Sequence, residues 1–327
     1  MNILLIDADS KIPNLALMKL SSYHKAKGDN VTLIKFNIPY YPQRKKQIQT
    51  IPFGYDKVYC SIIFPTSYPF INDQGLDNIH YGGTGHPHDK PLPHYIEDLE
   101  PDYSIYPENN ASYGFITRGC IRNCSFCIVR QKEGNIRQVN TVDNIVKHKF
   151  VIFLDNNILA HPEHRLFLQQ IIEKKVKCEF NQGLDIRLLD ENNSLLLSKL
   201  KYNKEYVFAF DNWKYKNILD QKIPILDKWR KSWKIKFFLY VHPDMPLQDT
   251  LKRIDYLKKR KILPYIMRDI SCYEAKYKNF YTDLAAWCNQ PAMFKKKTFE
   301  EFMIIRNLPK RAAESTELYK KVEREIL

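Results

Sequence analysis

The sequence predicts an α/β protein with a small parallel sheet near the N-terminus and a larger parallel-strand system after it. Two observations predict this class. Short apolar runs rich in Ile, Val, Phe and Tyr alternate with segments whose apolar residues recur at helical spacing. The chain also has 327 residues, of which 44% are hydrophobic and 13% aromatic, so it can bury a substantial core.

The N-terminal part reads as strand, helix, strand. The apolar run 2–6 ends at Asp7, and a helical pattern from Leu15 to Tyr23 is closed by Gly28. Residues 86–110 are rich in proline, histidine and acidic residues without periodicity, which indicates an extended connection. Further strands are expected at 31–36, 57–64 and 78–81, the last leading into the turn Gly82-Gly83-Thr84-Gly85.

From Tyr113 onward the alternation resumes, and six strand–helix units without internal repeats fit a partial or complete parallel barrel. We therefore expect three regions: an N-terminal domain with its connection (1–110), the barrel (111–290) and a basic helical extension (291–327). The expected strands are 113–117, 150–154, 179–181, 206–210, 236–241 and 264–267, and the expected helices between them are 141–148, 163–175, 190–200, 221–233 and 248–260.

Three of the seven cysteines lie close together, directly after the first strand of this second region. Cys120, Cys124 and Cys127 have the spacing C-x3-C-x2-C. An odd cysteine count argues against a disulfide framework, and thiolates select zinc or iron–sulfur centres. Structural zinc needs a second cysteine pair, which the chain lacks. Three cysteines would bind three irons of a 4Fe–4S cluster and leave the fourth open to a substrate. Three thiols that bind no metal are the remaining alternative to zinc and an iron–sulfur cluster.

With Phe126 directly before the third cysteine, this loop resembles the cluster loop of the radical S-adenosylmethionine (SAM) superfamily. The segments Arg118-Gly119-Cys120 and Phe126-Cys127-Ile128-Val129 resemble the corresponding segments of one subgroup, which contains tRNA methylthiotransferases and enzymes with cobalamin-binding domains. The resemblance covers residues 1–290. It implies an N-terminal Rossmann-like, cobalamin-domain-like sheet, a partial (β/α)6 barrel and a short helical C-terminus.

The same resemblance implies the chemistry. A 4Fe–4S cluster on Cys120, Cys124 and Cys127 would bind SAM, and an electron from a donor such as flavodoxin or ferredoxin would cleave it to a 5′-deoxyadenosyl radical. Cobalamin is disfavoured, because the loop after the first strand contains no histidine; some radical enzymes bind cobalamin without that ligand. Methylthiolation is also disfavoured, since it generally calls for three N-terminal cysteines and only Cys60 precedes Cys120.

Polar residues follow several strands, where the active site of a parallel barrel lies. The resemblance assigns Phe126 to the cofactor site and Asp155-Asn156-Asn157 to the amino group of SAM, in place of the family's common Gly-Gly-Glu. A helix cap is the alternative for these three residues. Gln182 and Arg187 would bind SAM or substrate, and a surface pair of Asp185 and Arg187 is the competing explanation. The corresponding positions of the later strands are Asp211, His242 and Arg268.

The net charge of +14 is typical of proteins that bind polyanions, and RNA is the first candidate. Cations and aromatics interleave from Trp213 to Lys236, as in RNA-binding surfaces, but Trp229 and Trp233 are also spaced to pack on one face of a helix. The lysines alternatively reflect composition bias. No apolar run is long enough to span a membrane and no signal peptide is evident, so we expect a cytoplasmic protein.

The sequence therefore predicts a radical SAM enzyme that acts on an unidentified substrate, with RNA or another large polyanion as the expected class. A non-catalytic iron–sulfur protein that binds RNA is the alternative from a different functional class. Formation of 5′-deoxyadenosine from SAM would distinguish the two.

Overall fold

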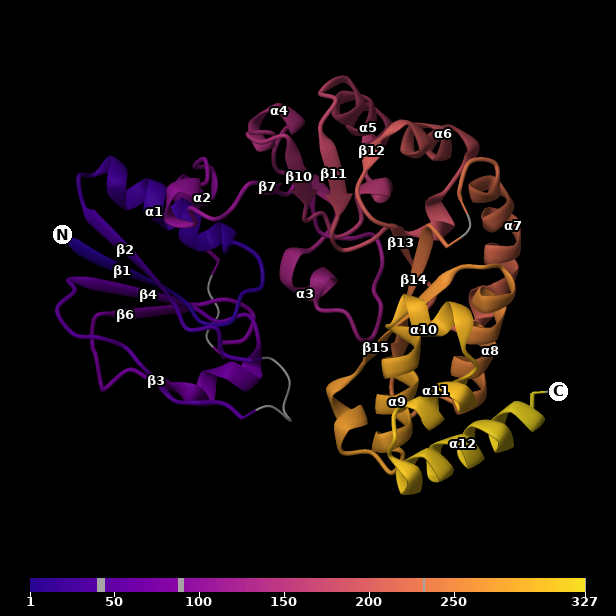
Figure 1. Cartoon of the computed structure of the whole chain (residues 1–327). Helices are drawn as coiled ribbons and strands as arrows, with labels where there is room; N and C mark the ends of the chain where they lie inside the picture. Colours follow the sequence, from indigo (N-terminus) through magenta and orange to yellow (C-terminus); the bar gives the residue numbers. More distant parts are fainter. Residues whose placement is uncertain (40–44, 88–90, 232, 327) are drawn as a thin grey trace. The chain divides into compact units, whose positions relative to one another are not determined.

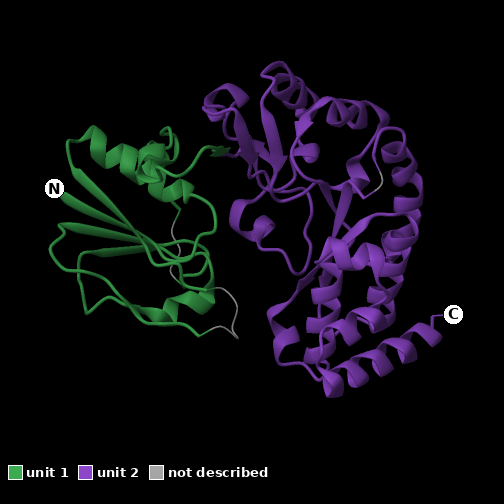
Figure 2. Cartoon of the chain, viewed as in Figure 1, with its two compact units in different colours: residues 1–113 green, residues 114–327 purple. Residues whose placement is uncertain are grey.

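Parallel strands and helices alternate through the whole chain, which confirms the α/β class; about 41% of the residues are helical. The computed structural model describes residues 1–39, 45–87, 91–231 and 233–326. It divides into two units, residues 1–113 and residues 114–327 (Figures 1 and 2). Among the described residues, none of the helices combines the length and the apolar character needed to cross a bilayer.

Unit 1 contains a parallel sheet with the strand order β2-β1-β4-β6. The predicted strands and helix of this region are confirmed, and the connection after residue 86 contains two short helical turns, α2 (His94–Glu97) and η2 (Tyr103–Ile105). The main elements are β1 (Asn2–Asp7), α1 (Leu15–Ala26), β2 (Asn30–Lys35), β4 (Lys57–Ser61) and β6 (Ile79–Gly82), with a small parallel pair, β3 (Gln49–Thr50) and β5 (Ile71–Asn72).

Alternate residues of β1 are buried on opposite sides of this sheet. Ile3 and Leu5 pack with α1, whereas Leu4 and Ile6 pack on the other side in a cluster that includes Cys60. A strand projects successive side chains to opposite faces, so a run without polar residues is the pattern of a strand covered on both faces. This is why the continuous apolar run 2–6 becomes a central strand.

The glycine turn after β6 packs against the chain's own backbone. Gly83 has a φ of +91°, and a Cβ atom at this position would lie 2.2 Å from the carbonyl oxygen of Ile62. A Cβ atom on Gly85 would lie 2.5 Å from the carbonyl carbon of Phe64. The glycines therefore permit a close approach between this turn and the segment after β4.

Unit 2 contains two larger sheets, with strand orders β12-β11-β10-β7 and β13-β14-β15, and a two-stranded antiparallel sheet of β8 (Thr117–Arg118) and β9 (Arg137–Gln138). Strand β7 spans the boundary between the two units. The neighbours β10/β11, β11/β12, β13/β14 and β14/β15 are parallel. The two sheets adjoin where the amide of Leu184 donates to the carbonyl of Val207 at 2.8 Å. The strands are β7 (Ser112–Gly114), β10 (Phe150–Phe153), β11 (Lys177–Phe180), β12 (Lys201–Tyr202), β13 (Tyr206–Ala209), β14 (Ile235–Val241) and β15 (Leu263–Arg268).

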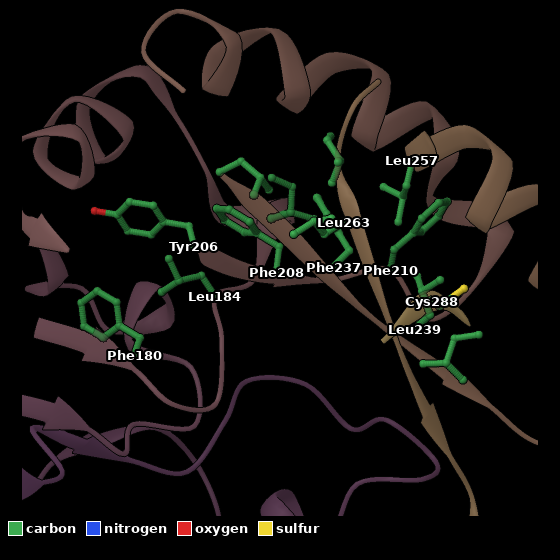
Figure 3. Packing of buried hydrophobic residues seen from close by; sticks show 14 of the residues in the cluster. Phe180, Leu184, Tyr206, Phe208, Phe210, Phe237, Leu239, Leu257, Leu263 and Cys288 are labelled. Carbon is green, nitrogen blue, oxygen red and sulfur yellow. The ribbon is translucent and has the colours of Figure 1, made fainter. Parts of the chain in front are cut away.

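Helices connect these strands and cover one face of the sheets. Phe208 of β13 and Phe237 of β14 pack with their ring centres 5.6 Å apart, in a cluster that also contains Leu263 of β15 and Leu257 of α8 (Leu247–Lys259) (Figure 3). The connecting helices are α4 (Val142–Ile145), α5 (His164–Glu173), α6 (Glu191–Lys199), α7 (Lys216–Asp227), α8 (Leu247–Lys259) and α9 (Lys278–Cys288).

One predicted helix is displaced. Helix α7 begins at Lys216 and ends at Asp227, whereas the sequence predicted a helix over 221–233. Trp229 and Trp233 thus lie beyond the helix, and Trp233 has a left-handed backbone with a φ of +63°. The expectation that both tryptophans share one helix face is wrong, although both pack against the core of unit 2.

The last helices of the chain are attached to α9 through a buried carboxylate. Asp283 of α9 is fully buried and accepts hydrogen bonds from Arg306, Arg311 and Ser315, with its oxygens 2.8 Å, 3.0 Å and 2.7 Å from the donors. These partners follow or belong to the C-terminal helices, which are α10 (Pro291–Lys296), α11 (Phe299–Ile305) and α12 (Pro309–Arg324).

We therefore expect Asp283→Ala to lower the free energy of unfolding by about 2–4 kcal/mol, because the variant leaves two guanidinium groups without their shared carboxylate. Asp255→Ala is the matched control, since Asp255 forms an exposed i,i+4 pair with Lys259 and should contribute less than about 0.5 kcal/mol. Urea unfolding followed by circular dichroism measures both. Equal effects of the two substitutions would contradict the anchoring role of Asp283.

Candidate functional site

The cysteine loop follows β8 (Thr117–Arg118) and is held by the short helix after it, α3 (Val129–Glu133). Gly119 has a φ of +85°, and a Cβ atom there would lie 2.2 Å from the carbonyl oxygen of Asn135. Its amide donates to the carboxylate of Glu133 at 3.2 Å, and the guanidinium of Arg130 donates to the carbonyl of Cys120 at 2.9 Å. The start of the loop is therefore fixed by both backbone conformation and hydrogen bonds.

The three thiols of this loop have different surroundings. The sulfur of Cys120 accepts from the backbone amide of Arg122 at 3.3 Å and from the side-chain amide of Asn157 at 3.5 Å. Burial raises the pKa of the Cys124 thiol, and the nearby guanidinium of Arg187 acts in the opposite direction. Cys127 is exposed.

The chemical type of the ligands in this loop fits a thiolate-bound cluster. The loop supplies three thiols, and N–H donors to a cysteine sulfur are a usual feature of iron–sulfur sites. In the described part of the chain, no three His, Cys, Asp or Glu side chains converge on one point at which a metal ion could be held. A cluster on these thiols would thus require the loop to bring its three sulfurs together.

Asp155, Asn156 and Asn157 follow β10 and contact, in turn, the segment that enters the cysteine loop, the helix that leaves it and the loop itself. The carboxylate of Asp155 is buried and accepts from the amides of Ile116 and Thr117, at 3.2 Å and 2.5 Å, and from the Thr117 hydroxyl at 2.7 Å. Its hydrogen-bonding capacity is used within the protein, so it does not present a free acceptor for SAM. The helix-cap alternative is also not realised, because the next helical turn has no side-chain cap.

The two asparagines are placed differently from each other. The side-chain amide of Asn156 donates to Glu133 at 2.6 Å, on the helix that follows the cysteine loop. Asn157 is only 4% exposed, and its amide faces the sulfur of Cys120. Its buried side-chain oxygen has no hydrogen-bond partner among the described residues. An unpaired buried acceptor is costly, which marks Asn157 as a candidate ligand-binding residue.

A cavity of about 730 Å³ lies beside the cysteine loop, at the ends of the strands. It brings together four of the predicted cofactor residues, Phe126, Arg187, Asp211 and His242, with one of the cysteines, Cys124. The other lining residues are Arg122, Asn123, Ser125, Asn212, Lys214, Tyr215, Tyr240, Asp244 and Met245.

Five predicted cofactor residues do not line this cavity: Asp155, Asn156 and Asn157, described above, and Gln182 and Arg268. Gln182 is exposed and does not line it. The guanidinium of Arg268 donates to Thr282 at 2.7 Å and to Tyr273 at 3.1 Å, and it also lies over the ring of Tyr273. The structure therefore gives Arg268 a role in attaching the end of β15 to the residues that follow.

Aromatic and acidic groups line one part of the cavity. The ring of Phe126 stacks on that of Tyr240 with centres 4.1 Å apart, and the amide of Tyr240 donates to Asp211 at 3.1 Å. Burial raises the pKa of the Asp211 carboxyl. Next along the chain, Nδ1 of His242 lies 3.4 Å from the carboxylate of Asp244.

A buried arginine holds the strand ends that carry these groups. Arg253 of α8 is fully buried, and its guanidinium donates to the carbonyls of Phe210 and Tyr240 at 2.9 Å and 3.1 Å. Burial lowers the pKa of Arg253 to about 10. Since Phe210 directly precedes Asp211, this one side chain fixes the exits of β13 and β14 relative to each other.

Sequence reasoning did not assign Arg122, Tyr240 or Asp244 to the site. A signal for Tyr240 exists, because alternate residues of β14 are fully buried and Tyr240 belongs to the other, half-buried set. Arg122 lies between Cys120 and Cys124, at a position that the C-x3-C-x2-C motif leaves open. The motif therefore gives no signal that this side chain lines a cavity.

Comparison of the chain with models of known protein families gave no match, and neither did comparison with curated proteins.

The position of Asp155 predicts a specific pH dependence. Burial raises the pKa of its carboxyl from the ordinary value of 3.8 to about 6, against the lowering effect of the bonds from Thr117 and Ile116. The folded state thus holds this proton more tightly than the unfolded state does, so the contribution of Asp155 to stability falls as the pH rises from about 4 through about 6.

Asp155→Asn cannot titrate at this position. The free energy of unfolding of the wild type, relative to that of this variant, should therefore fall by about 1–3 kcal/mol as the pH rises from about 4 to about 7. Urea titrations at several pH values measure it. A difference that does not change with pH would mean that the carboxylate titrates like an exposed one.

Proposed function

We propose that unit 2 is a radical SAM enzyme domain, in which Cys120, Cys124 and Cys127 hold a 4Fe–4S cluster. The main support is that the C-x3-C-x2-C loop lies at the ends of parallel strands and shares a cavity with residues from several of those ends. Catalytic groups of parallel α/β proteins lie at such strand ends. In this proposal unit 2 is the partial barrel, and unit 1 is a Rossmann-like sheet domain.

When bound, the cluster and SAM would supply reductive cleavage of the sulfonium and a carbon-centred radical for hydrogen abstraction. The residues of this chain would bind and orient SAM and the substrate and shield them from water. Phe126 and Tyr240 offer a stacked aromatic wall, and Arg253 fixes the strand ends that carry Asp211 and His242. A fixed wall of this kind positions reactants and limits the access of water.

Asn157 is the residue that we assign to the amino group of SAM. Its oxygen is buried and without a partner among the described residues, and its amide nitrogen faces the Cys120 sulfur. An ammonium group beside Cys120 would satisfy that oxygen. Of the three residues 155–157, Asn157 is therefore the one that fits, since Asp155 and Asn156 are already paired within the protein.

Unit 1 gives no support to methylthiolation. Cys60 lies in β4 and is 1% exposed within the core of the sheet, where burial raises the pKa of its thiol. A buried, protonated thiol is a poor ligand for a second cluster. The cavity beside Cys124 also favours an enzyme over the alternative of a non-catalytic iron–sulfur protein that binds RNA.

We expect protein reconstituted without oxygen to bind about four irons per chain and to show thiolate-to-iron absorption. Alanine at position 120, 124 or 127 should abolish both signals. Cys272→Ala is the control, because Cys272 does not belong to the C-x3-C-x2-C loop, is buried, and donates its thiol to the carbonyl of Val241. Reduction with dithionite in the presence of SAM should yield 5′-deoxyadenosine from the wild type. Full iron retention in Cys124→Ala would exclude the proposed cluster.

We further expect Asn157→Leu to weaken SAM binding about tenfold, the loss that corresponds to one hydrogen bond to a charged group. Gln182→Leu is the matched control, since it removes an amide of the same kind from an exposed position. Equilibrium dialysis with labelled SAM gives the affinities, and iron content verifies the cluster. If both variants bind SAM as the wild type does, Asn157 is not the acceptor.

A further inference from the structure

We infer that Arg122, Arg187 and Lys214 form a binding site for a phosphate monoester group on the substrate. The inference rests on the proposed function in one respect: it treats the cavity beside Cys124 as the substrate cavity. All three cations line that cavity, and they come from three different segments of unit 2.

The three cations are joined by a continuous set of contacts through Asp185 and Tyr215, which makes them one group. Asp185 accepts from Nε of Arg122 at 2.9 Å and from Nε and one terminal nitrogen of Arg187 at 2.6 Å and 3.0 Å. The guanidinium of Arg187 lies 5.0 Å from the ring centre of Tyr215, and the ammonium of Lys214 lies 5.2 Å from the same centre. The group therefore has a defined geometry.

Asp185 holds the arginines without using all their donors. Its side chain is 6% exposed, and the hydrogen bonds from Arg187 and Arg122 overcome the effect of burial, so the pKa of Asp185 lies below its ordinary value. Toward the described residues Arg122 donates through Nε alone, so both its terminal nitrogens remain available to a ligand; Arg187 keeps one. Lys214 is exposed and has no carboxylate partner among the described residues.

The charge of the group indicates which anion it takes. Three cations, Arg122, Arg187 and Lys214, and one carboxylate, Asp185, leave a formal charge of +2. A phosphate monoester carries a charge of about −1.5 to −2 at neutral pH, whereas a carboxylate carries −1. Arginine forks with free terminal nitrogens also match the oxygens of phosphate in geometry.

The rest of the cavity has the opposite polarity, which favours separate positions for SAM and for an anionic substrate. Asp211, Asp244 and His242 line the part of the cavity outside the cationic group. Asp211 also lies close enough to Arg187 for their charges to interact. SAM carries a sulfonium and an ammonium against one carboxylate, so its net charge is positive. The acidic part suits SAM, and the cationic group is left for an anionic substrate.

The test uses the full-length, iron-free protein and inorganic phosphate as the probe, with binding followed by the ³¹P resonance. Wild type should broaden and shift this resonance with saturation. The double variant Arg122→Gln with Lys214→Gln should bind phosphate at least about tenfold more weakly. The matched control is Lys228→Gln with Lys259→Gln, which also removes two positive charges but from exposed lysines paired with Glu191 and Asp255.

Circular dichroism verifies that both double variants fold. Loss of phosphate binding in the cavity variant alone would support the site. Equal losses in both double variants would overturn it, because the effect would then be one of net charge. Acetate that competes with phosphate at equal concentration would overturn the assignment to a monoester, as would a short RNA without terminal phosphates that binds more tightly through the same residues.

A second arm uses cluster-loaded protein and SAM. Phosphate and SAM should bind together, so phosphate should leave the affinity for SAM unchanged. Competition between them would show that the cations bind the carboxylate of SAM, which would overturn the inference. The first arm needs no iron, so the two proposals can fail separately. If the protein binds phosphate but forms no cluster, the proposed radical chemistry is excluded and the anion site is retained.

Discussion

Three consecutive side chains at the end of β10 hold the cysteine loop at three separate points, and the candidate site depends on them. Asp155 fixes the backbone that enters the loop at Ile116 and Thr117. Asn156 binds Glu133 on the helix that leaves it, and Asn157 contacts the sulfur of Cys120. Because a buried carboxylate without its donors would be very costly, Asp155 couples folding of the first strands of unit 2 to the position of the loop.

Arg253 has a similar function at the ends of β13 and β14. Its buried guanidinium joins these ends through two backbone carbonyls, so the residues after these strands cannot move independently. Asp155 and Arg253 are thus two polar anchors, each buried and each bonded to backbone groups. Rigid placement of strand ends is what a site needs when it must hold a reactive group and a substrate at a fixed separation.

The resemblance predicts functional residues at the strand ends, but position in the sequence does not decide what each side chain does there. Asp155 follows β10 and Arg268 is the last residue of β15, yet the structure turns one toward Thr117 and the other toward Thr282. The predicted pair of Asp185 and Arg187 exists, but it is no surface pair, since the carboxylate is buried and Arg122 shares it. Only the folded chain shows such a third partner, because Arg122 and Asp185 are 63 residues apart.

The sequence by itself determined the α/β class, most strands and helices, and the cysteine spacing, because these depend on the periodicity of neighbouring residues. It misplaced helix α7, because the spacing of Trp229 and Trp233 imitates a helical face while a left-handed residue at Trp233 lies outside any helix. The tertiary structure alone decided which polar groups are consumed by anchors and which reach the cavity. That choice depends on burial and on hydrogen-bond partners from distant segments, and local sequence pattern contains neither.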